Sequence, residues 1–477
     1  MIHFELHTTG GAQVSLIPAG RPSETPVQKW AQEHAEFTAK QGELFYMPHI
    51  DRPSDIFVGL GDVDKLSFEN LRHLFFQLAR LADTKKEKEL EIHMPDLGKC
   101  NRKTLMAALE GLRHAAYRFE HRLERTPELE LTVHYHPFAG PEEKLRQGIQ
   151  RATDMMDGVF LARDLTNETA NYLYPETLAQ RASEALTPLG VDVRVYEEEA
   201  IREIGMEAFL AVGQGSARRP RLIVMEYRGT SEDAPLTALV GKGITYDSGG
   251  YCVKTPSGMV TMHSDMGGAG TVIGTLAALA KAKAPCNVVG VVAACENLIS
   301  GDAYKTGDII GSLSGKTIEI VNTDAEGRVT LADAVYYATH QLKADRIIDL
   351  ATLTGACVVA LGPEITGAVT NDEAFFAELR TAADTAGEKV WLLPGDESLA
   401  KMNKSKVADI KNSGGRFGGA SSAGLFVGSF IKEGTPWIHL DIAGPAYLDE
   451  PSGYLPERAT GVQVRTLFNL LNPISAC

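Results

Sequence analysis

The chain has 477 residues and a mass of 51.6 kDa, more than one hydrophobic core usually organises, so its length predicts two domains. Hydrophobic residues make up 44% and charged residues 23% of the sequence, as in ordinary soluble globular proteins. The 62 acidic residues exceed the 47 Lys and Arg and give a net charge of -15, which argues against a nucleic-acid coat or an anionic membrane surface as the main partner.

The first third of the chain, residues 1–140, is typical of a small α/β domain. It opens without a basic stretch and a following apolar run, so we expect no signal peptide. The run 55–60 is strand-like, and the run 70–82 has the apolar spacing of a helix. His134 and His136 stand two apart in an extended stretch, as two metal ligands can, but no further ligand is near in the sequence and a strand surface is the stronger interpretation.

A helical pattern over residues 141–160 is long enough to link this domain to a second one at 161–477. In the second domain, strand candidates alternate with helical stretches at 268–281 and 331–342. This alternation predicts an α/β fold with a central, mostly parallel sheet flanked by helices. The apolar stretch 268–294 is cut by lysines and a proline too early for a membrane span. The strand candidates are residues 221–227, 236–240, 287–294, 317–321, 346–350 and 437–442.

Ligands of such sheets bind where strands end, and three loops after strand candidates carry the unusual residues. The loop 241–250 has four glycines around Lys242 and Asp247, which suits a backbone that approaches a ligand closely. It lacks the Walker spacing, and residues 311–317 have one residue too few between their glycines, so we do not expect a phosphate-binding loop.

The second loop runs from Lys254 to Asp265 and enters an apolar helix. An aspartate at a helix start is most often an N-cap, and this alternative stays open for Asp265. The third loop is residues 322–328. If it is extended, positions 324, 326 and 328 point to one side, because side chains of a strand alternate.

Together the three loops supply four carboxylates, which repel one another unless they are protonated or bridged by cations. A pair of divalent ions that share these oxygens would remove the repulsion and could activate a bridging water. Lys254 and Arg328 would remain to stabilise an oxyanion or to hold an anion. The four carboxylates are those of Asp247, Asp265, Asp324 and Glu326.

The third loop, Asn-Thr-Asp-Ala-Glu-Gly-Arg at 322–328, resembles the signature heptapeptide of the leucine aminopeptidase family of dizinc or dimanganese exopeptidases. The spacing from Lys242 to Asp265 is similar to that family's metal and catalytic segment, and similarity covers most of residues 155–470. The phrase at 297–301, followed by residues 305–309, most resembles the peptidase B branch.

The resemblance implies two zinc or manganese ions bridged by Asp247 and Glu326. Lys242 and Asp265 would complete the tighter site, and Asp324 the more exchangeable one. A lysine ligand must be neutral, so metal binding should weaken at low pH, and without metal Lys242 should pair with the carboxylates.

The resemblance also implies that Lys254 stays protonated and binds the substrate carbonyl oxygen, while Arg328 holds a bicarbonate that acts as the base. His263 is the alternative base, although the family does not require histidine there. The residues implied in substrate binding are Met262, Thr352, Leu353 and Gly355; plain core packing is the alternative for the methionine.

We therefore expect a homohexameric aminopeptidase that acts on peptides with a free α-amine. Neither a membrane nor nucleic acid is expected as a partner. A DNA-binding accessory or structural protein on the same fold stays an alternative, as does a two-metal phosphoester hydrolase. The six cysteines form no C-x-x-C pair, so we expect no disulfide framework and a cytoplasmic location.

Overall fold

The computed structural model describes residues 1–20, 25–34, 37–119 and 128–474. The chain forms two compact units, and the division between them falls inside helix α4 (Glu142–Asn167). The first unit is Met1–Met156 with Ser452–Leu455, and the second is Asp157–Pro451 with Pro456–Ile474. Within the described ranges, no helix is both long and apolar enough to cross a membrane.

The first unit is built on a six-stranded sheet in the order β1-β6-β5-β2-β4-β3, in which only β3 pairs antiparallel with its neighbour. Its helices α2 and α3 pack on each other, and Ser67 and Asn70 form a capping box that starts α2. The strands are β1 (Ile2–Leu6), β2 (Ala12–Pro18), β3 (Leu44–Met47), β4 (Asp55–Gly61), β5 (Glu89–His93) and β6 (Leu131–His136); the helices are α1 (Pro26–His34), α2 (Phe68–Lys85) and α3 (Asn101–Ala116).

The second unit contains an eight-stranded sheet in the order β15-β14-β17-β13-β9-β10-β8-β7. Its four middle strands, β17, β13, β9 and β10, are parallel, which confirms the predicted fold class. They are almost wholly buried, as expected of strands covered on both faces. The strands are β7 (Asp192–Tyr196), β8 (Arg221–Arg228), β9 (Leu236–Asp247), β10 (Asn287–Asn297), β13 (Arg346–Ala351), β14 (Ile365–Thr370), β15 (Lys389–Leu392) and β17 (Trp437–Asp441).

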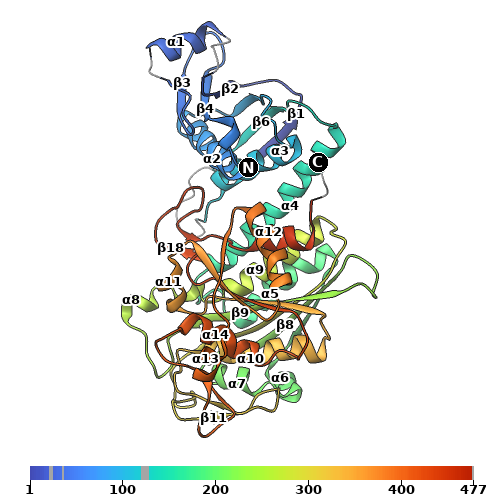
Figure 1. Ribbon diagram of the computed structural model, residues 1–477, viewed down its shortest axis with the longest axis vertical. Helices are drawn as coiled ribbons and strands as arrows, with labels where there is room; N and C mark the ends of the chain where they lie inside the picture. Colours follow the sequence, from blue (N-terminus) through green and yellow to red (C-terminus); the bar gives the residue numbers. More distant parts are fainter. Residues whose placement is uncertain (21–24, 35–36, 120–127, 475–477) are drawn as a thin grey trace. The chain divides into compact units, whose positions relative to one another are not determined.

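Helices cover both faces of this sheet: α9 packs with α5 and α15 on one face, and α10 packs with α7 and α14 on the other (Figure 1). The helices are α5 (Pro175–Leu186), α6 (Glu198–Ile204), α7 (Glu207–Gly213), α8 (Pro256–Met259), α9 (Gly267–Lys281), α10 (Glu326–Tyr336), α11 (Gly355–Leu361), α12 (Glu373–Ala386), α13 (Glu397–Ala400), α14 (Gly419–Gly428) and α15 (Val464–Leu471).

Two sequence predictions need correction here. The strand expected at 317–321 is only β12 (Ile318–Glu319), which pairs with β11 (Ile309–Ile310) and β16 (Ile410–Lys411) in a separate small sheet. The helix expected at 331–342 starts earlier, as α10, and ends in a π-helical turn. A further two-stranded sheet consists of β18 (Tyr447–Leu448) and β19 (Arg458–Ala459).

The described cysteines are mostly free thiols. Cys100 is the exception, because it is disulfide-bonded, which we did not expect from the sequence. Cys477 lies outside the described residues. The free thiols are Cys252, Cys286, Cys295 and Cys357.

Candidate active site

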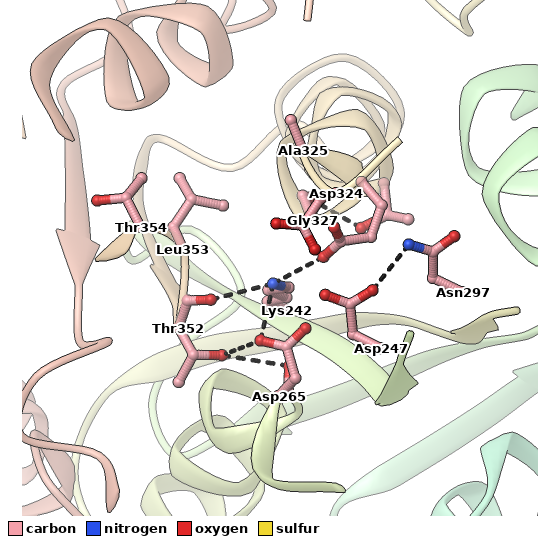
Figure 2. Close-up of polar contacts among 12 residues, drawn as sticks. Lys242, Asp247, Asp265, Asn297, Asp324, Ala325, Gly327, Thr352, Leu353 and Thr354 are labelled. Atoms are coloured by element: carbon pink, nitrogen blue, oxygen red, sulfur yellow. Dashed lines mark hydrogen bonds and ion pairs between the residues drawn. The ribbon is translucent and has the colours of Figure 1, made fainter. Parts of the chain in front are cut away.

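The candidate site forms where β9 extends past the end of its neighbour β13. β13 pairs with β9 only as far as Gly241, whereas β10 stays paired with β9 up to Asp247. Lys242 is the first residue of β9 beyond this step. Its Nζ donates a hydrogen bond of 3.0 Å to the carbonyl oxygen of Thr352, just after β13 ends (Figure 2). The step therefore places a buried amine at the carboxyl edge of the sheet.

Asp265 comes from the turn before α9. A Cβ atom on Gly268, in the first turn of α9, would lie 2.1 Å from the carbonyl oxygen of Leu350, so glycine lets the helix begin against the sheet. Asp265 Oδ1 then accepts hydrogen bonds from Lys242 Nζ at 2.8 Å and Thr352 Oγ1 at 2.7 Å. The residue at the N-cap position of α9 is Met266, so the helix-cap alternative for Asp265 was wrong.

Asp324 and Glu326 enter the site from a turn and a helix rather than from a strand. The backbone N–H of Asp324 donates to Asn322 Oδ1 at 2.9 Å, and Glu326 is the first residue of α10. The segment is therefore not extended, and the alternation considered for positions 324, 326 and 328 does not apply. Glu326 Oε1 nevertheless lies 2.9 Å from Lys242 Nζ, so the turn brings the carboxylate to the same amine.

Asp247 is held from two sides. Its Oδ1 accepts hydrogen bonds from Asn297 Nδ2 at 2.7 Å and from the backbone N–H of Gly249 at 2.8 Å. Its Oδ2 lies 2.8 Å from Lys254 Nζ, which also lies 2.6 Å from Asp324 Oδ1. Asn297 had no assigned role in the sequence analysis, because only the register of β10 shows that it lies beside Asp247.

Burial and crowding of like charges shift the pKa values of these groups. Burial and the neighbouring carboxylate of Asp247 raise the pKa of Glu326 to about 8, although Lys242 opposes the shift. Burial raises the pKa of Asp265 to about 6, again against Lys242. Burial alone would lower the pKa of both lysines, but the carboxylates around Lys242 and Lys254 outweigh it and raise it. Without metal, the two lysines are the counter-ions of the cluster.

The donor set fits divalent metal ions. Asp247, Asp265 and Glu326 each offer a carboxylate oxygen, and these oxygens all lie within 4.8 Å of one another. Asp265 Oδ2 and Glu326 Oε2 are buried and have no hydrogen-bond partner. A buried charged oxygen without a partner is costly, and a bound cation removes that cost.

Arg328 supplies a buried cation on α10 beside the cluster. Its guanidinium donates to the carbonyl oxygen of Asn412 at 3.0 Å, while its Nε has no partner. Burial lowers its pKa to about 10, against the pull of Glu326, Asp441 and Asp324. Arg328 therefore stays charged at neutral pH and keeps a donor available for an anion.

The predicted alternative base and the predicted substrate-binding residues differ in how close they lie to the carboxylate cluster. His263 packs against Tyr447 with ring centroids 5.7 Å apart, and burial and Arg458 lower its pKa. Its electrostatic neighbours are thus outside the carboxylate cluster. Thr352 contacts Asp265 directly, and the backbone N–H of Leu353 donates to Asp441 Oδ1 at 3.2 Å. Met262 is half-buried in the turn before Asp265, and Gly355 is exposed at the start of α11; a contact with substrate stays a prediction for both.

Comparison with known proteins gives a consistent set of relatives. Residues 160–468 match the model of the cytosol aminopeptidase family, catalytic domain, and residues 27–125 match that family's N-terminal domain. A probable cytosol aminopeptidase of Treponema denticola is 52% identical over 92% of this chain and 93% of its own length. One of Clostridium tetani is 45% identical over 98% of each chain.

Solved structures agree. A bottromycin maturation enzyme in complex with Mn superposes with a TM-score of 0.89 at 32% identity, over 97% of this chain and 99% of that one. A mutant of tomato leucine aminopeptidase gives a TM-score of 0.89 at 32% identity, over 99% of this chain and 97% of that one.

Proposed function

The chain belongs to the cytosol aminopeptidase family and is a metallo-exopeptidase, and from this premise we propose that it removes N-terminal residues from peptides by means of two divalent ions held at its carboxylate cluster. The proposal rests on one observation: the buried amine of Lys242 lies between the carboxylates of Asp265 and Glu326, each of which has a buried oxygen without a hydrogen-bond partner. Nothing favours the alternatives of DNA binding or phosphoester hydrolysis over this one.

We assign the metal ligands to the residues around Lys242. Asp247 and Glu326 would be shared by both ions, Lys242 and Asp265 would complete one shell, and Asp324 the other. Bound zinc or manganese would supply Lewis acidity, which lowers the pKa of water and polarises a carbonyl group. Lys242 must be neutral to donate its lone pair, so metal loading requires that it release the proton it shares with Asp265 and Glu326.

Two cations are left for the reaction itself. Lys254 keeps its proton, because Asp247 and Asp324 raise its pKa, and it is proposed to stabilise negative charge on the carbonyl oxygen of the scissile bond. Arg328, with its partnerless Nε, is proposed to hold a bicarbonate anion as proton acceptor. Burial and Arg458 lower the pKa of His263, and Val260 and Glu168 oppose this shift. Because these neighbours are outside the carboxylate cluster, His263 is not the preferred base.

The proposed substrate is a peptide with a free α-amine, whose first side chain would lie near Met262, Thr352, Leu353 and Gly355. A panel of aminoacyl amides, each tested free and N-acetylated, examines this directly. Release from the free amides alone supports the proposal, and equal hydrolysis of the acetylated ones contradicts it.

We also propose a homohexamer and a cytoplasmic location. The mass measured by light scattering on the purified chain tests the assembly, because one chain is 51.6 kDa.

A further inference from the structure

A second cluster of metal-type ligands lies in the first unit, on the strands β5 and β6. His93 and His136 are direct partners across these parallel strands, and Glu91 precedes His93 by two residues on the same face. One ligand atom from each of the three side chains lies within 4.8 Å of the other two. From the sequence, a strand surface was the stronger interpretation of His134 and His136, because no third ligand was near. The pairing of β5 with β6 places two further ligands, Glu91 and His93, next to His136.

The carboxylate oxygen of Glu91 lies at hydrogen-bond distance from His93, and its distances to both histidines also suit a shared ion. Glu91 Oε1 lies 3.0 Å from Nε2 of His93 and 3.4 Å from Nε2 of His136. Donors about 2.0–2.1 Å from a tetrahedral zinc ion are about 3.3 Å apart. The two imidazole rings are stacked, with centroids 4.0 Å apart and an interplanar angle of 7°, and both have Nε2 next to Glu91 Oε1.

The surroundings orient these ligands. Glu91 Oε2 accepts hydrogen bonds from the backbone N–H of Gly10 at 3.0 Å and from Gln13 Nε2 at 3.1 Å, which leaves Oε1 for the histidines. Burial and the neighbouring His93 lower the pKa of His136. Its ring is hydrogen-bonded to the backbone of Thr8, and because this bond acts in the opposite direction and favours the protonated ring, the ring is the donor. Such an outer hydrogen bond is what normally fixes a metal-binding imidazole.

Without a cation, the contact between His136 and Glu91 is favourable only when the imidazole ring is protonated. Nε2 of His136 is buried and has no hydrogen-bond partner, because its contact with the carboxylate lacks hydrogen-bond geometry. If the ring donates its other N–H to Thr8, a lone pair on Nε2 faces the negative oxygen of Glu91. A cation between them converts this repulsion into coordination.

We propose that Glu91, His93 and His136 form a binding site for a divalent transition-metal ion of the zinc type. Two imidazoles and a carboxylate leave one position of a tetrahedral ion open. The side chain of His93 is 60% exposed, so this position is accessible to water or a small ligand. His93 also lines a cavity of about 250 Å³ with Gln13 and Met94, which leaves room for such a ligand.

Zinc stoichiometry tests the proposal independently of catalysis. The full-length chain is stripped of metal, dialysed to equilibrium against Zn²⁺ alone, and its zinc content measured by mass spectrometry. Wild type is expected to bind one more zinc ion per chain than His93→Ala or His136→Ala. His34→Ala is the matched control, because His34 is an exposed histidine of the same unit that stacks on Trp30.

A spectroscopic measurement separates this site from the catalytic one. The proposed catalytic ligands include no histidine, so pulsed electron paramagnetic resonance on the Cu²⁺-loaded chain should show imidazole nitrogens that both variants lose. Both variants should keep the leucine-amide activity of wild type, which shows that they fold. Equal zinc content in wild type and the variants, or no imidazole signal, would overturn the proposal.

Discussion

Gly327 lies against the side chain of Lys242: a Cβ atom at Gly327 would be 2.4 Å from Cε of the lysine and 2.7 Å from its Nζ. The first turn of α10 therefore has to present a bare backbone to the lysine stem. This contact links the helix that carries Glu326 to the strand that carries the amine.

Replacing this glycine should displace the amine. Gly327→Ala is expected to lower kcat/KM for a leucyl amide by at least about tenfold, because Lys242 can no longer reach both Asp265 and Glu326. The control is Gly301→Ala, since nothing lies within 4 Å of a Cβ at that position. Equal activity of the two variants would show that the contact is unimportant.

Lys254 should act mainly in the reaction rather than in metal binding. Lys254→Ala is expected to lower kcat by about 10²–10³, with little change in bound metal, because the loss is that of a charge aimed at the transition state. Kinetics and metal analysis on the same sample measure both. A parallel loss of metal and kcat would instead make the lysine a support for Asp247 and Asp324.

Metal loading of the stripped protein should release protons. Burial and crowding raise the pKa of Glu326 to about 8 and of Asp265 to about 6, and Lys242 holds its own proton between them. Protons therefore compete with metal more strongly as the pH falls, and affinity should rise from pH 6 to pH 8. Titration calorimetry in buffers of different ionisation enthalpy counts the protons released. Release of no protons, with a metal affinity independent of pH, would contradict the prediction.

Asp333 should make stability depend on pH. Its oxygens accept the backbone N–H groups of Phe209 at 2.9 Å and Leu313 at 2.8 Å, but burial outweighs these bonds and raises its pKa to about 7 from 3.8. Between these values the folded state keeps a proton that the unfolded chain has lost. The free energy of unfolding should therefore fall as pH rises. The contribution of protonated Asp333 is fully present below about pH 4 and is lost above about pH 7.

Asp333→Asn, which does not titrate, is the reference for this effect. Denaturant unfolding at several pH values should show wild type losing a few kcal/mol relative to the variant between pH 4 and pH 8. A difference that stays constant over this range would place the pKa of Asp333 near its ordinary value.

The sequence predicted the parallel sheet and its long strands because buried parallel strands are continuous apolar runs, as in β9 and β10. It left open whether the loop 322–328 is extended, and in the structure the loop is a turn followed by the start of α10. The turn there depends on Asn322 and on Asn412, which donates to the carbonyl oxygen of Asn322 at 2.6 Å from 90 residues away. Local periodicity contains no information on such a contact.

The two histidines of β6 show the same limit. Their neighbours Glu91 and His93 are more than 40 residues earlier in the chain, and only the pairing of β5 with β6 brings them together. Asn297 was likewise visible only as part of a family phrase, until the register of β10 placed it opposite Asp247.

The most direct test of the account is Mn²⁺-dependent release of leucine from a leucyl amide by Glu326→Gln. Glu373→Gln is the matched control, because Glu373 is also the first residue of a helix but is exposed. The account predicts no release by Glu326→Gln, with wild-type circular dichroism and full activity in the control. Normal turnover by Glu326→Gln would contradict the assignment of the carboxylate cluster as the catalytic metal site.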